Sequence, residues 1–129
     1  MNAFLLAALM AVESGGNPFA VGDGGKAVGC LQIHAAVVAD VNRIAGRQTA
    51  PYTLADRLEV EKSKQMCVIY LAYYATEQRI GRPVTDEDRA RIWNGGPSGW
   101  KKPATEAYWA KVKRALAAQK QTRPRVYVR

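Results

Sequence analysis

Ten apolar residues in succession, Ala3–Val12, are followed at once by Glu13-Ser14-Gly15-Gly16-Asn17-Pro18. The apolar run predicts a helix over Asn2–Ser14, which the two glycines end. Glu13 then lies in the last helical turn, where the partial negative charge of the helix terminus and the apolar neighbours both disfavour its anion. We therefore expect a raised pKa, in the range that suits a general acid. The alternative is a surface Glu at a fraying helix end.

The net charge of +8 is confined to one end of the chain. Residues 101–129 hold nine Lys and Arg residues against a single acid, Glu106, whereas residues 1–100 hold ten basic and ten acidic residues. A basic end suits a polyanionic partner, namely nucleic acid, an anionic membrane or an anionic cell wall. A solvated helix face with a disordered tail is the alternative. At 129 residues the chain predicts one domain, residues 1–120, and a mobile basic tail, residues 121–129.

Several other classes of protein are disfavoured by the sequence. No apolar run has the length of a membrane span, so no membrane insertion is expected. The N-terminal run imitates the core of a signal peptide but has no basic residues before it, and we interpret it as the first helix of the domain. Cys30 and Cys67 lie among apolar residues and predict buried free thiols, with one bridge as the alternative. A lone His34 cannot make a zinc site, and neither a metal nor a cofactor is expected.

The periodicity of the chain predicts a mainly α fold of about five to six helices. A small irregular β or loop region, Asn17–Gln32, follows the first helix, because glycine is frequent there. A turn is predicted over Pro51–Asp56, and Thr85 is the expected cap of a helix with acids in its first turn. The remaining helices are predicted over His34–Ala45 and over Glu59–Ile80, which is the longest. The helix that Thr85 caps is expected to stop at Gly95, and the last helix to start at Thr105.

Three short motifs occur in a fixed order along the chain. The first reads Glu13-Ser14-Gly15-Gly16-Asn17-Pro18-Phe19-Ala20 and continues as Gly29-Cys30-Leu31-Gln32-Ile33. The second is Ile92-Trp93-Asn94-Gly95-Gly96-Pro97, and the third places Tyr108 three residues after Thr105, with Trp109 and Val112 beyond it. This pattern resembles the goose-type lysozyme and soluble lytic transglycosylase (SLT) superfamily over about residues 3–116. The resemblance implies a lysozyme-like fold.

The resemblance also implies a monomeric muramidase that acts on cell walls. Its substrate would be the β-1,4 bond between N-acetylmuramic acid and N-acetylglucosamine in the glycan strands of peptidoglycan. Glu13 would protonate the leaving oxygen and then act as a base. Either water attacks, as in a lysozyme, or the 6-hydroxyl of the muramic acid attacks and gives a 1,6-anhydro product, as in a lytic transglycosylase. The sequence leaves the two outcomes open.

Asp23 is the possible catalytic helper, because it lies in the glycine-rich loop after Glu13; a simple turn residue is the alternative. Asp40, on a helix expected to be solvated, is the weaker candidate. The resemblance implies substrate binding by Gln32, Ile33, Trp93, Asn94 and Tyr108. For each of these a structural role is the alternative, such as core packing for Tyr108 and stabilisation of the turn for Asn94.

The chain departs from the family pattern at two of these positions. Gly22 stands where many members have Ser, which removes a hydroxyl from the loop. Trp93 replaces the usual Tyr, so that stacking on a sugar face is kept while a phenolic hydrogen bond is lost. Ser14 and Asn17 are expected to shape the turn after Glu13, and His34 to begin a helix. Trp100 could be either a sugar platform or a loop anchor.

Two other functions remain as alternatives. The first is a non-catalytic peptidoglycan-binding or phage structural module on the same fold, against which the intact Glu13, Gln32 and Asn94 argue. The second is a basic helical protein that binds nucleic acid. No nucleic-acid motif is present and the charge lies at one end only, so no nucleic-acid partner is expected.

Overall fold

The computed structural model describes residues 1–122, with side chains as far as residue 119. Six α-helices and a small two-stranded sheet make up the described part, which confirms the predicted mainly α fold. The helices are α1 Ala3–Ser14, α2 Ala35–Ala45, α3 Val60–Tyr74, α4 Glu77–Ile80, α5 Asp86–Gly95 and α6 Glu106–Thr122. The strands are β1 Val21–Gly22 and β2 Ala27–Val28. Short 3₁₀ turns join several of these elements.

Helix α1 begins and ends at the residues that the sequence indicates. The Asn2 side chain accepts a hydrogen bond from the backbone N–H of Leu5 at 2.9 Å, which satisfies one free donor of the first turn. At the other end Gly15 adopts the left-handed conformation that glycine favours and closes the helix on the carbonyls of Ala11 and Met10. The helix therefore ends at Ser14, one residue after Glu13, which places Glu13 in its last turn.

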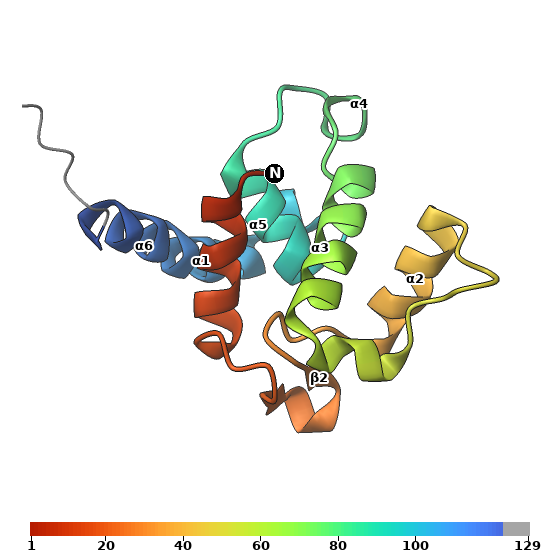
Figure 1. Cartoon of the computed structure of the whole chain (residues 1–129). Helices are drawn as coiled ribbons and strands as arrows, with labels where there is room; N and C mark the ends of the chain where they lie inside the picture. Colours follow the sequence, from red (N-terminus) through yellow and green to blue (C-terminus); the bar gives the residue numbers. More distant parts are fainter. Residues whose placement is uncertain (123–129) are drawn as a thin grey trace, which may run out of the picture.

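The core lies where α5 passes between α1 and α3, with α6 crossing behind them (Figure 1). Helix α2 packs against α3 at the side of this bundle and is joined to α1 through the sheet. The largest fully buried side chains come from every part of the chain: Leu5, Leu9, Leu31, Ile33, Val41, Met66, Ile92 and Val112. One continuous core therefore fixes α1, the sheet and α5 relative to one another.

The predicted loop or small β-element, Asn17–Gln32, is a short antiparallel hairpin. Val21 pairs with Val28 and Gly22 with Ala27, and Ile33 forms a further bridge with Val28. At Gly29 the backbone has φ +88°, and a Cβ would lie 1.8 Å from the carbonyl oxygen of Arg57. Only glycine allows this approach, which brings the hairpin against the segment before α3.

The predicted single helix over Glu59–Ile80 is wrong, because the chain leaves the helical conformation at Ala75. Thr76 then caps a new helix, α4, by accepting a hydrogen bond from the backbone N–H of Arg79, and the Arg79 side chain donates to the Tyr73 carbonyl. Neither glycine nor proline marks this break, so it was not expected from the sequence. As a result α6, with 17 residues, is the longest described helix.

Three further predictions concern turns, caps and thiols. The predicted turn over Pro51–Asp56 runs into a 3₁₀ helix, Leu54–Leu58, which Thr53 caps. Thr85 caps α5 as predicted, in a reciprocal capping box with Asp88. Cys30 and Cys67 are buried free thiols, as predicted.

None of the described helices is both long and apolar enough to cross a membrane. The predicted tail, apart from the two residues that complete α6, lies outside the described residues.

Candidate active site

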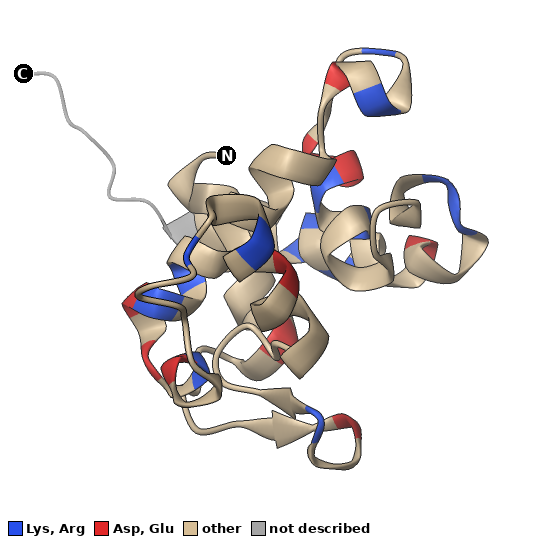
Figure 2. Cartoon of the chain, turned by 90° about the vertical axis from the view of Figure 1, so that its right-hand side faces the viewer, with Lys and Arg blue, Asp and Glu red and all other residues tan. Residues whose placement is uncertain are grey.

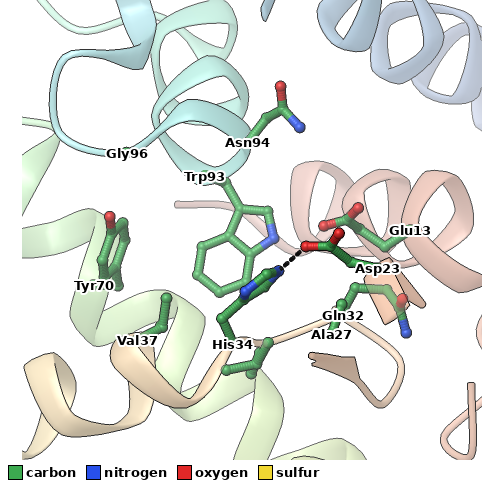
Figure 3. Close-up of a pocket in the computed structure, with 11 residues that line it drawn as sticks. Glu13, Asp23, Ala27, Gln32, His34, Val37, Tyr70, Trp93, Asn94 and Gly96 are labelled. Atoms are coloured by element: carbon green, nitrogen blue, oxygen red, sulfur yellow. Dashed lines mark ion pairs between the residues drawn. The ribbon is translucent and has the colours of Figure 1, made fainter. Parts of the chain in front are cut away.

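A cavity of about 460 Å³ opens beside the C-terminal end of α1 (Figure 3). Its wall is assembled from α1, the hairpin, the first half of α2, the middle of α3 and the end of α5. The lining residues are Glu13, Asp23, Ala27, Gln32, Ile33, His34, Val37, Tyr70, Trp93, Asn94 and Gly96. Six of the seven residues that the sequence selects are among them, and Tyr108 is not.

The turn after Glu13 is held by the two residues predicted to shape it. Ser14 Oγ donates to the Cys30 carbonyl at 2.7 Å and accepts from the backbone N–H of Gly16. Asn17 Oδ1 accepts from the backbone N–H of Phe19 at 2.9 Å. These bonds tie the end of α1 to the exit of the hairpin, so the Glu13 carboxyl is fixed at the cavity wall.

Burial raises the pKa of the Glu13 carboxyl to about 7, from an ordinary value of 4.5. The anion loses hydration among apolar neighbours, and a hydrogen bond with the Trp93 side chain opposes the shift only in part. Figure 3 shows the indole nitrogen on the side of the ring that faces Glu13. A carboxyl of this kind keeps its proton near neutral pH and can deliver it to a bound ligand.

Asp23 lies at the tip of the hairpin, with φ +50°, and forms an ion pair with His34. The distance from His34 Nε2 to Asp23 Oδ2 is 3.1 Å, and both side chains are substantially exposed. His34 precedes α2 at the capping position, as predicted, but its side chain makes no capping bond. The pair connects the hairpin to α2 across the wall of the cavity (Figure 3).

The Gln32 side chain is turned toward the hairpin backbone. Its Nε2 donates to the carbonyls of Ala20 and Gly29, at 3.1 and 3.0 Å. A Cβ on Gly22 would lie only 2.4 Å from Gln32 Oε1, so the amide uses the space in which a serine side chain would begin. Gln32 can therefore adopt this orientation because position 22 is a glycine, the residue that departs from the family pattern.

Trp93, Asn94 and Ile33 also line the cavity. Trp93 meets Tyr70 edge to face, with 5.6 Å between the ring centroids. Ile33 is buried, whereas Asn94 is exposed where α5 ends. Arg91, the residue before the second motif, donates to Thr105 Oγ1 at 2.8 Å and so ties α5 to the third motif.

Tyr108 lies behind the cavity wall and is almost wholly buried. Burial raises the pKa of its hydroxyl, and the proximity of Glu13 and Cys67 adds to the effect. The hydroxyl has no hydrogen-bond partner among the described residues. Trp100 is not among the residues that line the cavity; cations of Arg82 and Lys101 lie over its ring, which favours the loop-anchor interpretation.

Sequence reasoning did not select five of the lining residues: Ala27, His34, Val37, Tyr70 and Gly96. Tyr70 belongs to the apolar stripe of α3, and only the packing of α2 against α3 brings it to the cavity. Asp40, the weaker catalytic candidate, lies outside the cavity and bonds to Arg43 and Tyr74. In residues 1–122 we found no group of three or more His, Cys, Asp or Glu side chains that could hold a metal ion.

Comparisons with known proteins identify the family and the fold of the chain. A family model described as the transglycosylase SLT domain matches residues 1–114. A chain of the crystal structure of Aeromonas hydrophila PliI in complex with Meretrix lusoria lysozyme is similar at a TM-score of 0.73 and 27% identity. The structure of Tapes japonica lysozyme is similar in fold, at a TM-score of 0.70 and 23% identity. Each similarity covers 88% of this chain and 89% of the other. No curated protein matches the chain.

Proposed function

The chain belongs to the transglycosylase SLT domain family and is a glycan-cleaving enzyme, and from this premise we propose that Glu13 is the general acid with which it cuts peptidoglycan. The bond is the β-1,4 linkage between N-acetylmuramic acid and N-acetylglucosamine. The observation that carries the proposal is the position of Glu13, a partly buried carboxyl with a pKa of about 7 in the wall of a cavity.

The chemistry needs a proton donor first. The sugar oxygen leaves poorly as an alkoxide, so Glu13 gives it a proton while the bond to the anomeric carbon breaks. The carbon then carries positive charge, which the Glu13 carboxylate offsets. An attacking hydroxyl adds to this carbon and gives its proton to Glu13, which returns to its starting form. Water as the attacker gives hydrolysis, and the muramic 6-hydroxyl gives the 1,6-anhydro sugar.

Asp23 is the residue whose role differs between the two attackers. It lines the same cavity as Glu13, and His34 holds its carboxylate by an ion pair. In this position Asp23 can accept a hydrogen bond from an attacking water. If the attacker is the substrate's own hydroxyl, no second carboxylate is required, because Glu13 serves as acid and then as base.

The Glu13→Gln variant tests the proposal. Glutamine keeps the size of the side chain but has no proton to give, so we expect about a 10³-fold lower rate of clearing of cell-wall suspensions. Glu77→Gln, an exposed glutamate at the start of α4, is the matched control and should clear them like the native chain. Retained activity of Glu13→Gln would exclude Glu13 as the acid. Binding of peptidoglycan by the native chain without product release would favour a non-catalytic module instead.

Mass spectrometry of the released muropeptides determines the attacker. A 1,6-anhydro product is lighter by one water than the hydrolytic product. If the products are hydrolytic, Asp23→Asn should lower the rate by about tenfold or more. If they are anhydro sugars, the same substitution should have little effect.

The basic end of the chain supports attraction to an anionic cell wall. Lys111, Lys113 and Arg114 are exposed on α6; Figure 2 marks the Lys and Arg positions along the ribbon in blue. In our proposal the chain acts as a monomer that this charge draws to the wall, delivered there by a phage or from the periplasmic or outer side of a cell. Binding to isolated walls should then weaken as salt is added, because salt screens exposed charges.

A further inference from the structure

A second hollow, of about 480 Å³, continues the catalytic cavity along α2 and α3. It is lined by Ala36, Val37, Ala39, Asp40, Arg43 and Tyr70, and we call it the distal groove. Val37 and Tyr70 line both hollows. In Figure 3 these two residues lie at the end of the cavity away from Glu13, so the distal groove extends the cavity in that direction.

The far end of the distal groove presents an oriented guanidinium group. Arg43 donates through Nε and Nη2 to Asp40 Oδ1, and its Nη2 also reaches the Tyr74 hydroxyl at 3.3 Å. Its cation lies over the ring of Tyr73, 5.6 Å from the centroid. The Arg43 side chain nevertheless remains 59% exposed. It is therefore held on several sides while much of it stays accessible to a ligand.

The charge at this end is positive in balance. Arg79 is a second guanidinium, 4.4 Å from the ring centroid of Tyr73 and 5.3 Å from that of Tyr74. Asp40 is the acid there, and the hydrogen bonds from Tyr74 and Arg43 outweigh its partial burial and keep its pKa low. Arg43 pairs with the Asp40 carboxylate, Arg79 adds a second positive charge beside Tyr73 and Tyr74, and an arriving anion would balance the excess.

The shape of the distal groove suits a small residue followed by that anion. Ala36, Ala39 and Val37 make its wall short and apolar near the catalytic cavity, and Arg43 lies beyond them. Six residues of helix separate Val37 from Arg43, a rise of about 9 Å. A peptide of two residues spans about 7 Å when extended, and a lactyl linker adds to this.

We propose that the distal groove binds the peptide stem of a muramic acid residue, with Arg43 pairing with the first carboxylate of that stem. The stem begins on the lactyl group with alanine and continues with a γ-linked glutamate, whose α-carboxylate is free. Alanine lies against the alanine side chains of α2, and the carboxylate reaches the guanidinium of Arg43. The inference rests on the proposed function, since it assumes that the glycan lies in the catalytic cavity.

The test compares two substrates: glycan strands that carry stems, and the same strands after an amidase has removed them. For the native chain and for Arg43→Gln we would measure kcat/KM on both. We expect Arg43→Gln to lower the ratio of the two values, stem-bearing over bare, about tenfold, mainly through KM. Arg43→Lys keeps the charge but not the planar fork and should lie between. Arg47→Gln, two residues beyond the end of α2 and outside the distal groove, should leave the ratio unchanged.

An unchanged ratio in Arg43→Gln would overturn the proposal. If both kcat/KM values fall together, the loss indicates a contact with the glycan or a damaged fold. Strands whose glutamate is amidated provide a second arm, because they lack the free carboxylate and should resemble bare strands. Calorimetric titration with lactyl-alanyl-γ-glutamate separates this proposal from the cleavage chemistry. Weaker binding to Arg43→Gln than to the native chain would support the stem site even if neither strand is cut.

Discussion

The cavity beside Glu13 and the distal groove together form one extended groove, with a carboxyl group at each end. The surroundings of these two carboxyls shift their pKa values in opposite directions. Glu13 lies among apolar side chains, and burial raises its pKa to about 7. Asp40 is partly buried too, but Tyr74 and Arg43 bond to it and keep its pKa below the ordinary value. The protonation state of a carboxyl is thus set by its neighbours. The Glu13 carboxyl therefore holds its proton up to near neutral pH, whereas the Asp40 carboxyl is ionised there.

The pH dependence of cleavage measures the first half of this contrast. A general acid must be protonated, and the pKa of Glu13 is about 7. We expect kcat/KM on soluble glycan strands to be level below pH 7 and to fall about tenfold per pH unit above it, or about 100-fold by pH 9. A profile that stays level to pH 9, or that already falls near pH 5, would contradict the raised pKa.

The raised pKa of Glu13 should also make the free energy of unfolding depend on pH. The folded-state pKa of Glu13 lies above its unfolded value of 4.5, so its contribution is full below pH 4.5 and is lost as the pH rises through about 7. Glu13→Gln has no charge to bury. At pH 8 it should be more stable than the native chain, by up to about 3 kcal/mol, and at pH 4 similar. Urea unfolding at both pH values measures the difference, and Glu77→Gln should not show it.

Two tyrosines sharpen the comparison, one near each carboxyl. The Tyr74 hydroxyl donates to Asp40, whereas the Tyr108 hydroxyl, near Glu13, has no partner among the described residues. We expect Tyr74→Phe to lower the free energy of unfolding by about 1 kcal/mol, because an ionised acceptor loses a donor. Tyr108→Phe should leave it unchanged or raise it. Thermal unfolding of the two variants compares them, and equal losses would show that the two ends do not differ.

The smallest expected effect is that of Asp40→Asn. The folded-state pKa of Asp40 is lowered, so its contribution is present above its unfolded pKa and is lost as the pH falls through the folded value. Because the pair with Arg43 is partly exposed, we expect a loss of less than about 1 kcal/mol at pH 7. The loss should shrink toward pH 3. A loss that persists at pH 3 would point to packing and not to charge.

The position of Glu13 at one end of the groove could be predicted from the sequence, and the residues of the distal end could not. Glu13 follows an apolar run and precedes two glycines, and both signals are local, so the helix end and the raised pKa follow from neighbours along the chain. Tyr70 and Val37 reach the groove only because α2 packs against α3. The break at Ala75 follows from the cap that Thr76 makes and the contact of Arg79 with Tyr73, and no glycine or proline announces it.

The close approach of Gln32 to Gly22 has a consequence for how such sequences can change over evolution. A side chain at position 22 collides first with the Gln32 amide, the mobile end of a flexible side chain, and not with the backbone. The collision would detach that amide from the carbonyls of Ala20 and Gly29. The two positions are therefore coupled, and the effect of a mutation at one depends on the residue at the other. In lineages that gain a serine at position 22, the glutamine should give up its bonds to the hairpin backbone in the same step.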